Sequence, residues 1–501
     1  MESEVRSSGN DPDRNSVIGD RKQGIYMGSI KSSGRIGIVP ALTSRILAIA
    51  GQLNNTSGSW RAWAIVSMLA LAMFVWMTFI DGRPFWVMTT DPEPDYYYNS
   101  LTILETGIPA SVRHPGTPAY YVGGVLLAIN GTDPSDLQRF FNLTYLVAVL
   151  VFVFSMALFT RIALTGVSFA PSLLILSSLL LWPPFLTYSN YFSVESFVFS
   201  VSVMASAFVY TVLSSKPGVM TRSMLAFAIL VGMGTALKFT FLPVGISVGF
   251  MMAVVILWSN HVPSLKRKLL LIVRNGTALA LVIVVSFLIF VLPVVPYLYE
   301  FIGRIYIEVS KSSRVESIFV EIGRFFRLAP EFGILILFVL IGFGVLLGVR
   351  KYTRVDGAVL GVNIPQISVI PPTIALLLAL LLFSLSLLGT IPDLTSAEHV
   401  DPGHFLRQIT PIAGFLPLLL LITWKTYVAV WRGLDNSIFR QRAHGVILIA
   451  ISAFLIISSS AGYFSWRSET FHDIKQSVAH HQDALGMIAP SGERVAIFDW
   501  G

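Results

Sequence analysis

Long apolar runs recur along the chain, with short polar connections between them. A transmembrane helix needs about 20 predominantly apolar residues, because each residue adds about 1.5 Å toward a hydrocarbon core about 30 Å thick. Eleven runs approach that length and predict membrane-spanning helices at about 63–80, 141–160, 167–187, 192–213, 223–240, 241–258, 275–297, 331–348, 369–391, 405–428 and 445–463. The run at 118–130 is shorter and rich in glycine. We therefore expect a helix there that lies at the membrane interface and does not cross.

The composition supports the same class of protein. Of the 501 residues, 54% are hydrophobic and only 13% are charged. A water-soluble protein could not bury so large an apolar share, so the pattern predicts an all-α polytopic membrane protein. The chain has no cysteine, which excludes disulfides, thiolate metal sites and cysteine nucleophiles. The net charge of +7 fits cytoplasmic loops that face anionic lipid, so we expect no nucleic-acid partner.

Three regions follow from this pattern. Residues 1–60 are polar and rich in Ser, Gly, Arg and Asn, which is typical of a disordered basic cytoplasmic tail. Residues 61–464 hold the apolar runs and form the transmembrane domain. Residues 465–501 turn polar and end in RVAIFDWG, a strand-like run that would fit a short outer segment or the start of a truncated soluble domain.

The distribution of basic residues predicts the topology. Cytoplasmic loops of membrane proteins carry an excess of Lys and Arg. If the N-terminus is cytoplasmic and 118–130 does not cross, every short basic connection falls on the cytoplasmic side. The outer side then receives the acidic loop after the first run, a mixed-charge segment at 298–330 that we expect to form an interfacial helix, and the loop at 392–404. Counting 118–130 as a span would reverse every later connection.

The first outer loop carries the densest group of carboxylates. It reads DPEPDYYYNSLTILETGIPASVRHPGTPAYY and contains Asp91, Glu93 and Asp95, followed by three tyrosines. Arg113 and His114 lie later in the same loop. Such a loop suits a hydroxyl-rich or cationic partner, and tyrosines suit both a membrane interface and stacking on a sugar ring. The alternative is a solvated connector without a binding role.

Further ionisable residues are predicted on the same outer side. Glu195 lies at the outer start of the fourth span, and Lys238 lies near the outer end of the fifth. His404 and Arg407 flank the tenth span. Ionisable residues in or beside spans are costly and usually functional. The alternatives are a Lys238 side chain that only extends to the headgroups, a Glu195 that is solvated in a short loop, and a simple interfacial His404.

Four of these stretches together resemble the GT-C superfamily of membrane glycosyltransferases, which use polyprenyl-phosphate-linked sugars. DYYYNSLTILETGIP with RHPGTPAYYVGGVLL looks like the first outer loop of the family, and TYSNYFSVESFVFSVSVMA looks like the segment where an acidic residue opens the fourth span. GMGTALKFTFLP is similar to a glycine-rich stretch that ends in lysine, and HFLRQITPIAGFLPLLLLI is similar to a late Arg-X-X-X-Pro span. The resemblance covers about residues 60 to 430. The chain has His-Pro-Gly-Thr-Pro where protein O-mannosyltransferases and aminoarabinose transferases tend to carry a Lys-Pro-Pro step, so no subfamily is assigned.

The resemblance implies an inverting hexosyl- or pentosyltransferase that moves a sugar from a lipid-linked donor to an acceptor lipid, protein or glycan. Asp95 is expected to be the catalytic base, with Asp91 second. The donor phosphate would be bound by Lys238 and Arg407, with Arg113 and His114 sharing that task. Glu195, Glu93 and His404 would position the acceptor or a metal. A divalent ion (Mg, Mn or Zn) held by Asp95 and Glu195 is an open alternative to a metal-free mechanism.

Two other functions remain open from the sequence. A transporter would explain many helices and buried charges, although the chain shows no internal repeat of the kind that many transporters carry. A polysaccharide polymerase or ligase is closer in chemistry, and it would usually show a large late outer loop with Arg and His. In each case we expect a multi-pass protein among membrane lipids. In a prokaryote it would lie in the plasma (inner) membrane, with its active site on the outer or periplasmic side.

Overall fold

The computed structural model describes residues 58–80, 93–110, 116–132, 137–182, 192–214, 220–259, 264–300 and 410–434, with a few short stretches after 300. The chain divides into two units, Met1–Ile46 and Leu47–Gly501, and all described residues belong to the second. The predicted tail at 1–60 lies outside the described residues except for its last three positions, which begin the first helix. The predicted outer segment at 465–501 lies outside them entirely.

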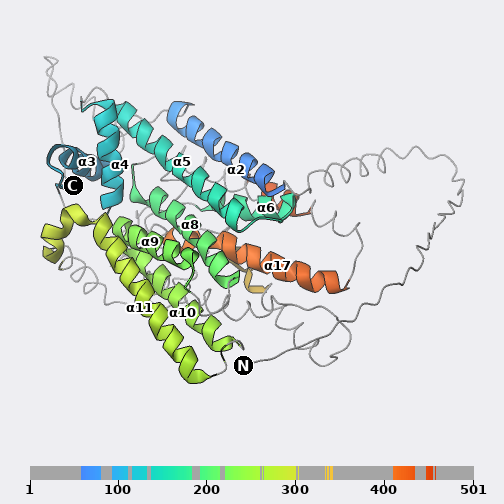
Figure 1. Ribbon diagram of the computed structural model, residues 1–501. Coiled ribbons are helices and arrows are strands. Elements are labelled where there is room, and N and C mark those ends of the chain that lie inside the picture. Colours follow the sequence, from blue (N-terminus) through green and yellow to red (C-terminus); the bar gives the residue numbers. More distant parts are fainter. Residues whose placement is uncertain are drawn as a thin grey trace, which may run out of the picture. The chain divides into compact units, whose positions relative to one another are not determined.

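Every secondary-structure element within the described residues is a helix (Figure 1). The elements are α2 (Gly58–Val75) with the π-helical turn η1 (Trp76–Ile80), α3 (Glu93–Thr106), α4 (Thr117–Asn130), α5 (Leu137–Ile162), α6 (Phe169–Ser177) with η4 (Ser178–Leu181), α8 (Val194–Ser214), α9 (Arg222–Leu237), η5 (Phe239–Phe241), α10 (Leu242–Trp258), α11 (Leu265–Phe290), η6 (Leu292–Tyr297) and α17 (Leu416–Leu434).

The predicted apolar runs correspond to helices wherever the structure describes them. In the part of the chain that the structure describes, five helical segments are long and apolar enough to cross a membrane, namely Gly58–Val75, Leu137–Ile162, Val194–Ser214, Phe239–Leu257 and Leu265–Phe290. Three shorter apolar helices are Phe169–Leu181, Arg222–Leu237 and Thr410–Lys425. The runs at 369–391 and most of 331–348 and 445–463 lie outside the described residues. The described part of the protein is thus all-helical, with several helices able to span a membrane, and the number eleven stays a prediction.

The run at 118–130 forms a separate short helix, as expected. Helix α4 has 14 residues, which corresponds to about 21 Å at 1.5 Å per residue. That length is shorter than a hydrocarbon core of about 30 Å. The proline next to the start of α4 fits a first helical turn, because the N–H that proline lacks has no intrahelical partner there. Its interfacial position stays a prediction.

One predicted boundary was wrong. The seventh run was placed at 275–297, but α11 begins ten residues earlier, at Leu265. Ser264 caps this start by accepting a hydrogen bond from the backbone N–H of Arg267 at 3.2 Å. The basic residues in this stretch therefore lie on the helix and not in a loop. Lys and Arg favour helices, and their long apolar stems allow a helix to extend past the apolar region.

Helix α8 lies at the centre of the packing. Of its most apolar 18-residue stretch, 83% is buried, and the helix packs against α5, α9 and α17 (Figure 1). Helix α11 is much more exposed, because only 17% of its most apolar 18-residue stretch is buried. Its side chains Leu270, Val273 and Leu281 are exposed. Because these exposed side chains are apolar, α11 has the character of a helix whose outer face contacts lipid.

Contacts between helices define two ends of the bundle. The ring contacts Phe140–Phe192 and Phe239–Phe287 bring together the starts of α5 and α8 and, separately, the ends of α9 and α11. We call the end that holds Phe192, Glu195 and Lys238 the site end. At the opposite end Lys425 contacts Tyr210, which lies near the end of α8.

Candidate functional site

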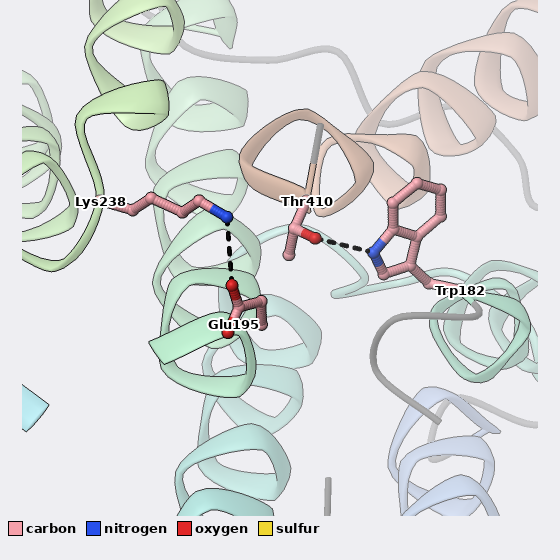
Figure 2. Close-up of polar contacts among 4 residues, drawn as sticks. All are labelled: Trp182, Glu195, Lys238 and Thr410. Carbon is pink, nitrogen blue, oxygen red and sulfur yellow. Dashed lines mark hydrogen bonds and ion pairs between the residues drawn. The ribbon is translucent and has the colours of Figure 1, made fainter. Parts of the chain in front are cut away.

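A buried ion pair lies at the site end. The Lys238 Nζ donates a hydrogen bond to Glu195 Oε1 at 3.1 Å, and the two side chains are 12% and 2% exposed, respectively (Figure 2). The residues come from two antiparallel neighbours, since Glu195 lies in the first turn of α8 and Lys238 directly follows α9. A buried charge needs a partner of opposite sign, and each residue supplies one for the other. The helix dipole also favours a carboxylate at the start of α8.

Local backbone geometry places Lys238 at this point. Lys238 is extended (φ −158°, ψ 126°), and its N–H still donates to the carbonyl of Gly234 at 2.8 Å. The chain then reverses through η5 into α10. A Cβ at Gly234 would lie 2.6 Å from the Phe241 ring, so the missing side chain allows this tight reversal. Lys238 therefore projects from a break between two helices and not from the middle of one.

The segment that leads into α17 is fixed beside α8 at the same end. The Trp182 Nε1 donates to Thr410 Oγ1 at 3.3 Å, and both residues are buried (Figure 2). The Ser202 hydroxyl, on α8, donates to the carbonyl of Pro411. Gly414 packs against Ser202 so closely that a Cβ there would clash with its side chain. These contacts hold positions 410–414 against α8 about two turns beyond Glu195.

An aromatic cluster joins the first-loop helices to the start of α8. Tyr96, on α3, contacts Tyr120 of α4 at 5.3 Å and Phe192 at 5.6 Å between ring centroids. Phe192 also contacts Phe140 of α5 at 5.7 Å. Gly123 of α4 lies against Phe192, where a Cβ would come within 2.8 Å of the ring. The loop expected to hold the catalytic carboxylates is thereby packed against the residue three positions before Glu195.

Asp95 lies in the first turn of α3, next to this cluster. Its side chain is half-buried, and its backbone carbonyl accepts a hydrogen bond from Asn99 Nδ2 at 2.7 Å. Burial, and secondarily the negative charge of Asp95, raises the pKa of the Tyr120 phenol above its usual range. Burial likewise raises the pKa of Tyr97, with smaller contributions from Tyr98 and Glu105. The phenol of Tyr120 is therefore neutral near Asp95 at physiological pH.

The structure brings together one pair of the residues expected at the site, Glu195 and Lys238, and places Asp95 on an element of the same end. Glu93 begins α3, but its side chain is outside the described part of the chain. Asp91, Arg113, His114, His404 and Arg407 also lie outside the described residues.

A metal site is not formed by the described residues alone. No group of three or more His, Cys, Asp or Glu side chains in that part of the chain is placed to hold a metal ion. Glu195 Oε1 is already bound by the ammonium group of Lys238. The divalent ion at Asp95 and Glu195 stays a prediction.

Two buried hydroxyls close in sequence to the ion-pair residues were not identified from the sequence. Ser193 is 1% exposed and lies directly before α8. Thr240 lies two positions after Lys238. Within the described residues, neither the Ser193 Oγ nor the Thr240 Oγ1 has a hydrogen-bond partner, although both atoms are buried. A Ser directly before a helix is usually its N-cap, so the sequence gives no indication of another role for Ser193.

Comparisons with known proteins add the following. No protein-family model matches the sequence. No curated protein matches it either. One similar solved structure is ArnT from Cupriavidus metallidurans bound to undecaprenyl phosphate, with a TM-score of 0.44 and 14% identity over 86% of this chain and 73% of that chain. Another is the archaeal oligosaccharyltransferase AglB from Archaeoglobus fulgidus in complex with an inhibitory peptide and a dolichol-phosphate, with a TM-score of 0.47 and 14% identity over 80% of this chain and 56% of that chain.

Proposed function

We propose that this protein is an integral-membrane glycosyltransferase of the GT-C type. It would move a hexosyl or pentosyl group from a polyprenyl-phosphate donor to an acceptor on the non-cytoplasmic side of the membrane. The observation that carries the proposal is that a partly buried cation, Lys238, lies at the same end of the bundle as Asp95 of α3. A base for the acceptor and a positive charge for the leaving phosphate are the two groups this reaction needs.

The proposed reaction is a single displacement at the anomeric carbon. The acceptor oxygen or nitrogen attacks that carbon on the face opposite the phosphate, and Asp95 takes its proton. The bond between the anomeric carbon and the phosphate oxygen breaks, and the phosphate leaves with the electron pair. One displacement inverts the configuration at carbon. In this scheme Asp91 is the second choice for the base.

Lys238 and Arg407 are proposed to bind the leaving phosphate. Lysine acts as a point charge, and arginine can grip two phosphate oxygens at once. Arg407 precedes Thr410 by three positions, and Thr410 is anchored to Trp182 at the site end. Arg113 and His114 are proposed to bind the same phosphate. The buried hydroxyls of Ser193 and Thr240 support it, because a phosphate or a sugar would supply partners for both.

Glu195, Glu93 and His404 are proposed to orient the acceptor. A divalent ion (Mg, Mn or Zn) at Asp95 and Glu195 would add positive charge at the phosphate. The acceptor is a lipid, protein or glycan. The protein is proposed to lie in the plasma (inner) membrane if it is prokaryotic, with its active site on the outer or periplasmic side.

The proposal is tested with membranes from cells that express the chain. Labelled polyprenyl-phosphate sugars are added, and lipid, protein and glycan fractions are searched for new product by mass spectrometry. We expect one labelled product that is absent from membranes with the Asp95→Asn variant. A parallel reaction with a chelator tests the divalent ion. Label that moves across the membrane without a new covalent bond would instead indicate a transporter, and a long repeating product would indicate a polymerase or ligase.

A further inference from the structure

The ion pair with Glu195 affects how Lys238 can bind a phosphate. Its ammonium group lies 3.1 Å from the Glu195 carboxylate, and that carboxylate is almost completely buried. A phosphate that approached the same ammonium group would come close to a fixed negative charge. Like charges at such short range repel strongly where water is largely excluded. The geometry therefore makes Glu195 and a phosphate rivals for Lys238.

We propose that Glu195 is a positioning residue that holds Lys238 in the empty site and competes with the lipid phosphate for its ammonium group. This inference rests on the proposed function, since it assumes that a polyprenyl phosphate binds at Lys238. For Glu195 it replaces the acceptor or metal contact proposed above, since its Oε1 is bound to Lys238. Lys238 exchanges partners when the lipid phosphate arrives and returns to Glu195 when the phosphate leaves.

The structure supplies the features that such an exchange needs. Lys238 projects from extended backbone between α9 and η5, so its movement breaks no helix. Its side chain is a compact charge on a flexible four-carbon stem, which can swing between two partners. Glu195, by contrast, is held in the first turn of the most buried candidate span. The fixed partner is thus the carboxylate, and the mobile one is the ammonium group.

The exchange also explains why a carboxylate is useful beside a phosphate site. Without Glu195, the Lys238 ammonium group would lose this carboxylate before the phosphate binds, and loss of a nearby opposite charge is unfavourable for a largely buried cation. With Glu195, the Lys238 ammonium group is paired before the phosphate binds. After sugar transfer, Glu195 competes with the lipid phosphate for this ammonium group and so promotes release of the lipid phosphate. The carboxylate therefore weakens phosphate binding while it keeps the empty site stable.

The test uses the full-length protein in detergent and farnesyl phosphate as the probe, with farnesol as the uncharged control. Glu195→Gln keeps a hydrogen-bond acceptor but removes the competing charge. We expect this variant to bind farnesyl phosphate about tenfold more tightly than the wild type, with a larger rise in melting temperature on binding. In transfer assays its donor KM falls and its kcat also falls, because release of the lipid phosphate slows. Glu195→Asp restores the charge and returns the Kd to within about threefold of the wild type.

Lys425 provides the matched control. It contacts Tyr210 near the far end of the same helix α8. Lys425→Met should lower the melting temperature and leave the Kd for farnesyl phosphate unchanged. A purely structural role for Glu195 predicts the same behaviour for Glu195→Gln, and that outcome would overturn the inference.

The remaining outcomes are also decisive. If the wild type binds farnesyl phosphate no better than farnesol, the proposed function itself fails. If it binds, but Glu195→Gln binds equally or more weakly, only the exchange is wrong. If Glu195→Gln is too unstable for titration, the yield of folded protein decides. Purification with farnesyl phosphate should raise that yield, and farnesol should not. Equal yields with both additives would contradict the exchange.

Discussion

Glu195 and Lys238 are 43 positions apart in the chain, and their contact changes what a substitution at Lys238 should do. Treated alone, a lysine at the end of a span costs energy to insert, so its replacement by an apolar residue would be harmless to the fold. The ion pair with Glu195 changes this expectation. Loss of Lys238 leaves the Glu195 carboxylate buried without this cation, and loss of a partner from a buried pair is far more costly than loss of the whole pair.

We therefore expect Lys238→Met to lower the free energy of unfolding by about 3–5 kcal/mol. The double variant Glu195→Gln with Lys238→Met should recover most of that loss, because no charge then remains buried. Thermal unfolding in detergent for the wild type, both single variants and the double variant measures the coupling. A double variant no more stable than Lys238→Met alone would show that the contact does not contribute to stability.

Asp95 is the residue on which the proposed chemistry depends most. Asp95→Asn should reduce sugar transfer by about 10²–10⁴-fold, the usual contribution of a general base. Expression and membrane insertion should be unchanged, because the carboxylate is only half-buried at the start of α3. Asp91→Asn should reduce transfer less.

Glu105→Gln is the control for that experiment, since Glu105 is an exposed carboxylate on the same helix. Its transfer rate should match that of the wild type. Full activity in Asp95→Asn together with loss of activity in Asp91→Asn would move the base to Asp91 and keep the reaction class.

Helices α9 and α11 pack closely because glycine allows it. A Cβ at Gly232 would lie 2.6 Å from the Ser286 Cβ and 2.7 Å from the carbonyl oxygen of Ile283. The Ser286 hydroxyl donates to the carbonyl of Ile229 at 3.0 Å, which ties the two helices together at the same level. Small residues at helix crossings and hydrogen bonds between helices are the usual means of association in membranes.

Gly232→Ala should destabilise the protein by about 1–3 kcal/mol, because the added methyl group forces α9 away from backbone atoms of α11. Gly276→Ala is the matched change, since Gly276 lies on α11 with nothing within 4 Å of its Cβ position. It should raise stability by about 0.5–1 kcal/mol through helix propensity. Melting temperatures of the two variants test this, and equal values would mean that the α9–α11 contact tolerates the extra atom.

The ends of the helices also show where local patterns mislead. The basic residues near the start of α11 look like a loop because they interrupt an apolar run, yet Ser264 caps a helix that includes them. The end of the same helix is easier to predict, because η6 contains Pro293 and Pro296, which cannot continue an α-helix. Capping and proline are local signals, whereas the depth of a helix in the membrane is not.

Charges are distributed unequally between the two ends of the bundle. Arg161 ends α5, Arg222 begins α9 and Lys266 lies in the first turn of α11. These positions belong to the end opposite Glu195 and Lys238, since the helices run in alternating directions from the site end. Among the described residues, these three basic positions thus share one end, and the side of the membrane that this end faces stays a prediction.

The absence of cysteine from the chain allows a direct test of sidedness. Ala110→Cys and Thr165→Cys place single thiols at exposed positions, the first after α3 and the second after α5. A membrane-impermeant thiol reagent applied to intact cells should label only Ala110→Cys, and permeabilised cells should show both. Labelling of Thr165→Cys in intact cells would invert the topology and place the site end on the cytoplasmic side.

The class of protein and most of the described helices can be predicted from the apolar runs alone. Apolar runs and their lengths are local properties, and a bilayer demands helices from them, so α2, α5, α8 and α10 follow without tertiary information. The short run that forms α4 was also recognisable, because length alone separates it from a span.

Which polar residues contact one another depends on how the helices pack. Asp95, Glu195 and Lys238 were recognisable as unusual because charges beside apolar runs are costly. Their relation was not, since the ion pair depends on how α8 and α9 pack and on the backbone reversal after Lys238. The contact between Trp182 and Thr410 joins positions 228 residues apart. Nothing local to either residue encodes that contact, because side chains so far apart in sequence are brought together only by the packing of the helices that carry them.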